Sequence, residues 1–254
     1  MLFSMILGEA VDEGLIGANP CRKLRVTFTE RPERPHATPD EVVVISARMP
    51  TGLGLMVLTD AYTGLRWGEL AGLQWTRTHL DDSNPRIDVD AGDGALHELG
   101  GRLELGPPKS AASARTVHLP PFLAALLVDH REINPDGPFV FTGVQGGLHR
   151  RANFRQRFWQ PALTGNRDRG WAPVQQQMHF HDLRHTHETG LVEDQVPRVM
   201  RLQRLGHKRK DIDDFYSHVT PAIREKMLAA LQTRWDRSGD RGVAQPLTRG
   251  PDGA

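Results

Sequence analysis

Residues 63–70 read Thr-Gly-Leu-Arg-Trp-Gly-Glu-Leu, and this stretch decides how the chain is divided. Apolar residues at helical spacing lie on both sides of it, over residues 53–62 and 65–73. We expect two helices that are separated near Thr63 and Gly64. Arg66 then belongs to the second helix.

Upstream, helical spacing of apolar residues runs from Leu2 to Ile16 and stops at the Gly17-Ala18-Asn19-Pro20 stretch. Residues 20–37 are rich in proline, arginine and glutamate and have no periodicity, which indicates a linker. Thr38 then has the sequence of a helix N-cap, with proline next and Glu41 three residues on. A folded domain is expected to begin there.

Downstream, short strands are expected at residues 87–89, 103–105 and 116–119, forming a small antiparallel sheet. The turn residues 107–110 place Lys109 at the tip of a hairpin between the last two strands. The remaining helical segments are expected at 122–131, 151–163, 183–192, 197–205, 212–219 and from Pro221 onward. The predicted fold class is therefore α+β, mainly α-helical with a small antiparallel sheet.

The 254 residues are 38% hydrophobic and 25% charged, and no apolar run is long enough to span a bilayer, so a membrane protein is not expected. The first stretch lacks a basic region and contains Glu9 and Asp12, which is not typical of a signal peptide. Cys21 is the single cysteine, so the chain forms no internal disulfide and fits a reducing cytoplasm.

The net charge of +1 conceals a basic region. Between His149 and Lys210 there are thirteen arginines and lysines and only five acidic residues. Charge alone does not separate an ordinary solvated surface from a face that contacts phosphates, and both interpretations stay open.

Four segments carry chemistry when they are considered together: residues 63–70, Lys109, residues 181–186, and residues 205–207 with Tyr216 nine positions later. Two arginines can bind the non-bridging oxygens of one phosphate through charge-assisted hydrogen bonds. Histidines add donors or accept a proton near neutral pH, tyrosine supplies an oxygen nucleophile, and lysine can protonate a leaving oxygen.

This order of residues resembles the tyrosine recombinase family, which includes the phage integrases. The family pattern of arginine, hairpin lysine, histidine with arginine three residues on, Leu-Gly-His and tyrosine falls on Arg66, Lys109, His181, Arg184, His207 and Tyr216. The intervals of 23 residues from Arg184 to His207 and 9 from His207 to Tyr216 are typical of the family. The resemblance covers Thr38 to Trp235 and implies the recombinase catalytic-domain fold.

The resemblance implies site-specific cleavage and rejoining of DNA without metal or nucleotide cofactor. The Tyr216 hydroxyl would attack the scissile phosphate to give a 3′-phosphotyrosyl bond and a free 5′-hydroxyl. The two catalytic arginines and His207 would stabilise the transition state. Lys109 would act as general acid, and His181 would help to remove the tyrosine proton.

The resemblance also implies double-stranded DNA as partner and a homotetramer on DNA, with a monomer free in solution and no membrane. Arginines and lysines expected to follow the DNA backbone are Arg150, Arg151, Arg155, Arg157, Lys208 and Arg209. The stripe of Ile223, Met227, Leu231 and Trp235 either covers its own domain or packs on a neighbouring protomer.

By the same resemblance, residues 1–19 are the terminal helix of a largely missing core-binding domain. The linker over 20–37 leads to a catalytic domain over 38–237, and residues 238–254 form a disordered tail. Because most of the DNA clamp is not seen, a second hypothesis is a DNA-binding remnant that does not complete recombination. A histidine metal site formed by His179, His181, His185 and His187 is a weaker alternative, since the usual zinc motif is absent.

Overall fold

The computed structural model describes residues 2–22, 24, 33–81, 83–133, 137–143, 146–207 and 218–239. Contacts divide the chain into one unit that ends at Glu33 and another that begins at Arg34. None of the described helices is both long and apolar enough to cross a membrane.

The N-terminal unit contains one helix, α1 (Leu2–Asp12), with no buried residue. It ends before the predicted Gly17, because Gly14 adopts a left-handed φ of 73°. Phe3 and Leu15 are largely exposed on this unit. The described residues of this unit therefore form no hydrophobic core of their own.

The second unit begins with α2 (Pro39–Ala47), and its predicted N-cap is confirmed. The Thr38 hydroxyl accepts a hydrogen bond from the Glu41 amide at 3.3 Å, and the Glu41 carboxylate accepts one from the Thr38 amide at 2.8 Å. This reciprocal pairing satisfies two amides at the helix start.

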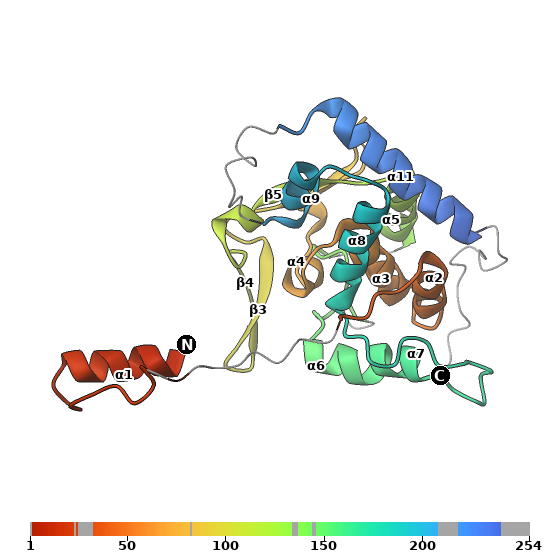
Figure 1. Ribbon diagram of the computed structural model, residues 1–254. Coiled ribbons are helices and arrows are strands. Elements are labelled where there is room, and N and C mark those ends of the chain that lie inside the picture. The colour runs from red at the N-terminus through yellow and green to blue at the C-terminus, as the bar shows by residue number, and fades with distance from the viewer. Residues whose placement is uncertain are drawn as a thin grey trace. The chain divides into compact units, whose positions relative to one another are not determined.

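Helix α3 (Thr51–Thr63) is the centre of the domain, since every residue from Leu53 to its end is buried. Around it lie α2, α5 (Pro121–Ile133) and α8 (Asp182–Glu193), as Figure 1 shows. The predicted break is confirmed at Gly64, where the chain leaves α3 and reaches α4 (Trp67–Ala71).

Gly64 is required at this break for two reasons. Its φ of +66° is left-handed, and a Cβ there would lie 2.7 Å from Leu205 Cδ2. The α3–α4 turn therefore fits tightly against the end of another helix. Arg66 was expected inside the second helix but is its N-cap, with extended backbone, and α4 begins at Trp67.

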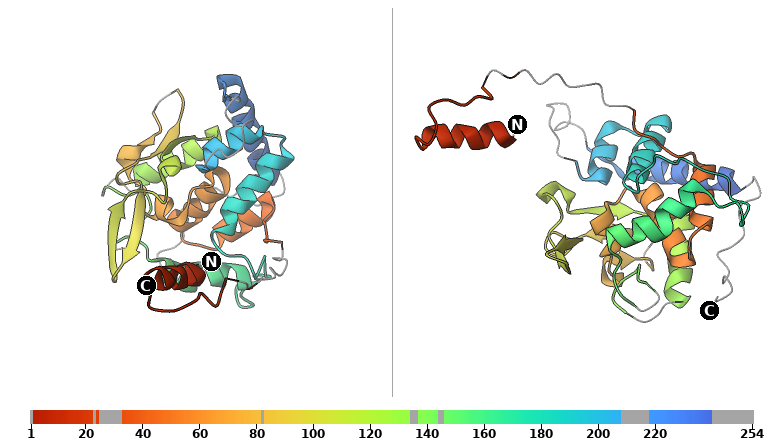
Figure 2. Two further views of the ribbon diagram at one scale, coloured as in Figure 1. Left: turned by 60° about the vertical axis from the view of Figure 1, so that its left-hand side comes forward. Right: turned by 90° about the horizontal axis from the view of Figure 1, so that it is seen from below.

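The strands form two small sheets, whereas one was predicted. The first contains β1 (Thr78–His79), β2 (Arg86–Val89) and β5 (Arg115–His118) in the order β1-β2-β5, after the short 3₁₀ turn Trp75–Arg77. The second pairs β3 (Ala95–Leu99) with β4 (Arg102–Gly106). In both views of Figure 2 this hairpin projects from the edge of the helical body.

The predicted hairpin with Lys109 at its tip is therefore wrong. Strand β4 pairs with β3 through a turn at Gly100 and Gly101, whose φ values of 54° and 80° suit a two-residue hairpin. Lys109 lies instead on the connection from β4 to β5, next to the 3₁₀ turn Ala111–Ser113. The Gly-Gly pair was the overlooked signal.

The helix predicted over 151–163 is present as one continuous run. It consists of α6 (Arg151–Phe154), a π-helical turn (Arg155–Trp159) and α7 (Gln160–Thr164). Helix α9 (Arg198–Leu205) also matches its prediction. Most of the helix predicted at 212–219 lies outside the described residues.

The final helix, α11 (Pro221–Gly239), packs on its own domain. Met227 and Leu231 are buried in the core, and the Trp235 ring stacks on Phe122 at 4.4 Å with an interplanar angle of 5°. The apolar stripe of α11 therefore covers the core of its own domain, which was one of the two interpretations of this stripe. The helix includes Ser238 and Gly239, where a tail was predicted, and residues 240–254 lie outside the described residues.

Candidate DNA-cleavage site

Arg66 caps α4 and is held by a buried acid. Its backbone amide donates to Glu69 Oε2 at 2.9 Å, and its Nη1 donates to Glu69 Oε1 at 2.9 Å and to Ser113 Oγ at 3.0 Å. Since Glu69 is three residues further along α4, the helix itself fixes the direction of the Arg66 guanidinium.

Arg115 on β5 is a second arginine on the same carboxylate. Its Nη1 and Nη2 donate to the two oxygens of Glu69 at 3.2 and 3.0 Å. Burial by itself would raise the pKa of Glu69, but Arg115 and Arg66 outweigh that effect and lower it. Glu69 is therefore an anion that orders two cations. Sequence reasoning did not select Arg115, because nothing in its strand distinguishes it from a surface arginine.

Arg184 on α8 is buried and extends to the α3–α4 turn. Its Nη1 donates to Gly64 O at 2.5 Å, and its Nη2 contacts Leu205 O and lies 3.1 Å from His207 Nε2. Burial first, and then Arg66 and Arg115, lower the pKa of Arg184 to about 10. The group is still a cation at neutral pH.

Three arginines meet on successive carbonyls at the end of α9. Arg204 O accepts from Arg115 Nε at 2.6 Å, Leu205 O accepts from Arg184, and Gly206 O accepts from Arg66 Nη2 at 3.5 Å. The last carbonyls of a helix carry partial negative charge, which offsets the repulsion among the three cations.

The turn after α9 depends on Gly206. Its φ is +62°, and a Cβ there would lie 2.9 Å from Ala112 O. His207 follows directly and is carried to Arg184 by this turn. Burial first, and then Arg184, lower the pKa of His207, which favours the neutral ring as acceptor for the Arg184 N–H.

His181 lies at the N-terminus of α8, one turn before Arg184. Burial first, and then Arg184 and Arg34, lower its pKa. A neutral imidazole can accept a proton, which is the property required of a general base.

A cavity of about 620 Å³ connects these groups to the basic surface. It is lined by Arg66, Lys109 and His181, and also by Arg151 and Arg155 from the α6 run. Three predicted catalytic residues and two predicted DNA-binding residues thus open on one space. Arg184 and His207 are not among the residues that line it, and they connect to Arg66 through the adjacent carbonyls of Leu205 and Gly206.

The other predicted residues have different positions. Arg150 contacts Gly101 O on the β3–β4 hairpin, and Arg157 is exposed but is not among the residues that line the cavity. Tyr216, Lys208 and Arg209 lie outside the described residues.

The alternative of a histidine metal site gains no support from the part of the chain that the structure describes. There, no three His, Cys, Asp or Glu side chains gather in a way that could hold a metal. His187, one of the four histidines considered, is buried and bonded to Arg204 and to the Ala61 carbonyl.

The model of the phage integrase family matches residues 38–222, which is most of the chain. This chain belongs to the phage integrase family. It therefore belongs to the tyrosine recombinases, and the resemblance seen in its sequence is confirmed.

Curated relatives of this integrase-family chain include the integrase of Mycobacterium phage L5, which is 27% identical over 250 residues and is matched over 96% of this chain and 60% of its own length. A XerC-like tyrosine recombinase of Caldanaerobacter subterraneus is 27% identical over 87% of this chain and 61% of its own length. This chain thus spans about 60% of the curated relatives it matches.

Solved structures confirm the fold class of the integrase-family chain. The Tn1549 transposon integrase, in complex with transposon right end DNA, has a TM-score of 0.66 at 16% identity, over 90% of this chain and 76% of that one. A lambda integrase tetramer bound to a Holliday junction has a TM-score of 0.53 at 18% identity, over 85% of this chain and 58% of that one.

Proposed function

We propose that this chain is a site-specific DNA recombinase that cleaves and rejoins strands through a 3′-phosphotyrosyl intermediate on Tyr216. The observation that supports this most directly is the convergence on the Leu205-Gly206-His207 turn. Arg66 contacts it from 140 residues away in sequence, and Arg184 contacts both its first carbonyl and its histidine. Family motifs that are far apart in sequence thus form one cationic cluster.

The proposed chemistry uses Arg66, Lys109 and His181, which line the cavity, together with Arg184, His207 and Tyr216. The Tyr216 oxygen forms a bond to the scissile phosphorus while the bond to the 5′-oxygen breaks. Arg66, Arg184 and His207 donate hydrogen bonds to the non-bridging oxygens, as the transition state gains negative charge. Lys109 gives a proton to the departing 5′-oxygen, and His181 accepts the tyrosine proton. The reverse attack by a 5′-hydroxyl of another strand restores the DNA backbone, so neither metal nor nucleotide enters the balance.

Arg151 and Arg155 extend the cation cluster along one wall of the cavity. In the proposal they bind phosphates of double-stranded DNA, together with Arg150, Arg157, Lys208 and Arg209. The solved lambda integrase tetramer on a Holliday junction supports a homotetramer on DNA. In the proposal the protein is a monomer when free and acts in the cytoplasm.

The proposed catalytic unit is residues 38–237. The family match begins at residue 38, and the contacts separate the chain just before it, at residues 33 and 34. We further propose that α1, within residues 1–19, is the terminal helix of a core-binding domain, that residues 20–37 link the two, and that residues 238–254 are a tail.

The test uses the full chain and a library of nicked duplexes with a randomised core. The nick lets the cleaved fragment leave, so that a covalent protein–DNA adduct accumulates. The adduct should form with a metal chelator present and disappear in Tyr216→Phe. An adduct that persists in Tyr216→Phe excludes Tyr216 as nucleophile, and a strict metal requirement contradicts the mechanism. DNA binding without any adduct would instead support the alternative, a DNA-binding remnant.

A further inference from the structure

Arg204 is buried in the last turn of α9, with only 1% of its surface exposed. Its Nε donates to His187 Nε2 at 2.8 Å, its Nη1 to His118 O at 2.8 Å, and its Nη2 to Tyr62 O at 2.7 Å. Burial, and then Arg115, lower its pKa to about 9, so it is still a cation at neutral pH. None of these three acceptors is a carboxylate. Such a buried charge is costly, which calls for a reason beyond stability.

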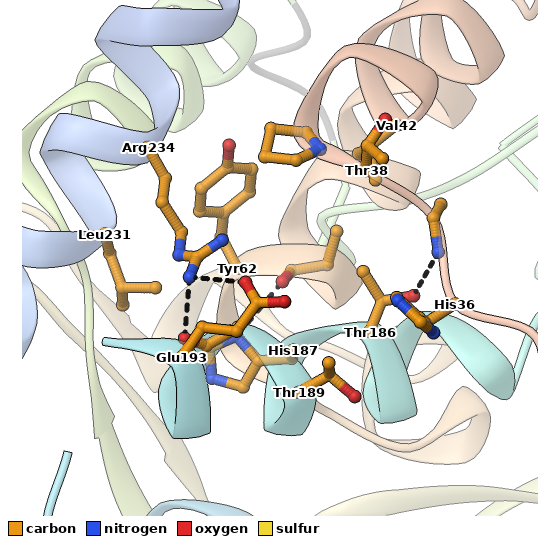
Figure 3. A pocket seen from close by; sticks show the side chains of 14 residues that line it. His36, Thr38, Val42, Tyr62, Thr186, His187, Thr189, Glu193, Leu231 and Arg234 are labelled. Atoms are coloured by element: carbon orange, nitrogen blue, oxygen red, sulfur yellow. Dashed lines mark hydrogen bonds and ion pairs between the residues drawn. The ribbon is translucent and has the colours of Figure 1, made fainter. Parts of the chain in front are cut away.

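His187 on α8 accepts from this arginine. Its Nδ1 donates to Ala61 O on α3 at 3.0 Å, which leaves Nε2 without a proton and able to accept from Arg204. Burial first, and then Arg204, keep the pKa of His187 well below its ordinary value, so the ring is neutral. Figure 3 shows His187 of α8 and Tyr62 of α3 facing the same small cavity.

Three members of this network, Tyr62, His187 and Arg204, each lie three or four residues from a proposed catalytic residue. Tyr62 is four residues before Arg66, His187 is three residues after Arg184, and Arg204 is three residues before His207. A Cβ at Gly64 would lie 2.9 Å from His187 Cδ2, so the ring also packs directly against the turn that leads to Arg66. The planar guanidinium of Arg204 on α9 thus joins α3, which precedes Arg66, to α8, which carries Arg184, and α9 itself leads directly to His207.

We propose that Arg204 and His187 are a buried positioning pair that sets the spacing of Arg66, Arg184 and His207 for DNA cleavage. The inference rests on the proposed function. Arg204 and His187 are only 1% and 2% exposed, so in the proposal the pair acts through the other residues and does not touch DNA. A displacement of a reacting group by about 1 Å can slow a reaction by about 100-fold. Correct placement of the catalytic residues can therefore outweigh the free-energy cost of burying the Arg204 charge.

The test measures single-turnover adduct formation with the duplex recovered from the randomised library, and measures DNA affinity separately. Arg204→Lys keeps the charge, but an ammonium cannot extend to three acceptors in one plane. His187→Phe removes both hydrogen bonds, whereas His187→Asn supplies an oxygen acceptor and an N–H donor. We expect Arg204→Lys and His187→Phe to slow adduct formation by about 10- to 100-fold with little change in affinity, and His187→Asn to retain most of the rate.

Leu127→Ala on α5 is the matched control, because Leu127 is fully buried and takes no part in the hydrogen bonds of this network. It should lower the melting temperature without slowing cleavage at a temperature where all variants are folded. Three outcomes would overturn the inference while the adduct of the wild-type chain still supports the proposed function. They are wild-type rates of adduct formation in Arg204→Lys and His187→Phe, equal loss of rate in the two His187 variants, and an equal loss of rate in Leu127→Ala. If the wild-type chain forms no adduct, both fail together.

Discussion

Arg115 and Glu69 form a two-pronged ion pair in which both carboxylate oxygens accept from one guanidinium, at 3.2 and 3.0 Å, with both side chains almost fully buried. Arg66 shares the same carboxylate. Glu69 therefore determines how two of the cations in the proposed site are directed, although it has no role in the proposed chemistry itself.

Glu69→Gln should strongly destabilise the fold. It leaves two guanidinium groups without their anion, and breaking a buried pair in this way costs about 3–5 kcal/mol. The free energy of unfolding from urea titration at neutral pH measures the loss. Glu104→Gln on the exposed hairpin is a suitable control, and an equally small change in the two variants would show that Glu69 orders nothing.

The same pair predicts a pH dependence of stability. The pKa of Glu69 is lowered in the folded chain, so its contribution is complete above the unfolded pKa and disappears as the pH falls through the folded pKa. Unfolding measured between neutral and acid pH should show a smaller loss of stability in Glu69→Gln than in the wild type. Parallel curves for the two proteins would contradict this.

Asp60 has the opposite dependence. Its carboxyl is buried on α3, and neither oxygen has a hydrogen-bond partner in the described part of the chain. Burial raises its pKa well above the ordinary value, although Arg184 opposes this. Asp60 therefore lowers the free energy of unfolding by an amount that grows as the pH rises from its pKa in the unfolded chain toward its pKa in the folded chain.

Asp60→Asn should remove this dependence, since the amide has the same shape and no charge to bury. We expect a gain of about 1–3 kcal/mol in the free energy of unfolding at neutral pH, and a small difference at acid pH where the carboxyl is protonated. Chemical denaturation at both values measures the difference. A loss of stability at neutral pH in Asp60→Asn would indicate that the ionised carboxylate is stabilising.

Two glycines test how tightly the site is assembled. Gly64→Ala combines a left-handed φ with a contact of 2.7 Å to Leu205, whereas Gly101→Ala on the hairpin has a left-handed φ and open space around it. In both variants, an alanine at a left-handed φ lowers the free energy of unfolding by about 1–2 kcal/mol. Overpacking against Leu205 lowers it by a further amount of about 1–3 kcal/mol at Gly64 only. Thermal unfolding of both variants separates the two terms, and equal losses would mean that the helix ends do not meet as described.

Much of this site was accessible from sequence because it lies on local motifs. The capping box at Thr38, the break at Gly64 and the start of α11 are each determined by a few neighbouring residues, and all three are in place. The fold class and the family also followed from residues in a fixed order. What connects the motifs was not accessible, because those contacts cross 46 residues from Arg115 to Glu69 and 142 from Arg204 to Tyr62.

Lys109 shows why strand pairing was the weakest part of the prediction. Each of the three predicted strands was located within a residue or two, but β4 could pair with the strand before it or the one after it. Strands β1 and β3 were not predicted. The missed strand β3 contains His97 and Glu98, and this lowers its apolar signal. Pairing across Gly100 and Gly101 then placed Lys109 on a connection between two sheets, still at the cavity.

Arg155 provides the last prediction, on how the proposed DNA is held. Its side chain is exposed on the π-helical turn and lines the cavity, so a phosphate can approach it without rearrangement of the core. Each phosphate contact contributes about −0.9 to the slope of the logarithm of affinity against the logarithm of salt concentration. Arg155→Ala should therefore make the slope shallower by about 1 and weaken binding to all duplexes by a similar factor.

Arg131→Ala on α5 is the control. Its guanidinium lies over the Trp75 ring and is not part of the cavity lining, so this variant should leave the slope unchanged. Fluorescence anisotropy with two unrelated duplexes over a range of salt concentrations measures both quantities. If the two variants have the same slope, the cavity wall does not contact the DNA backbone; if Arg155→Ala weakens binding to only one duplex, Arg155 recognises bases.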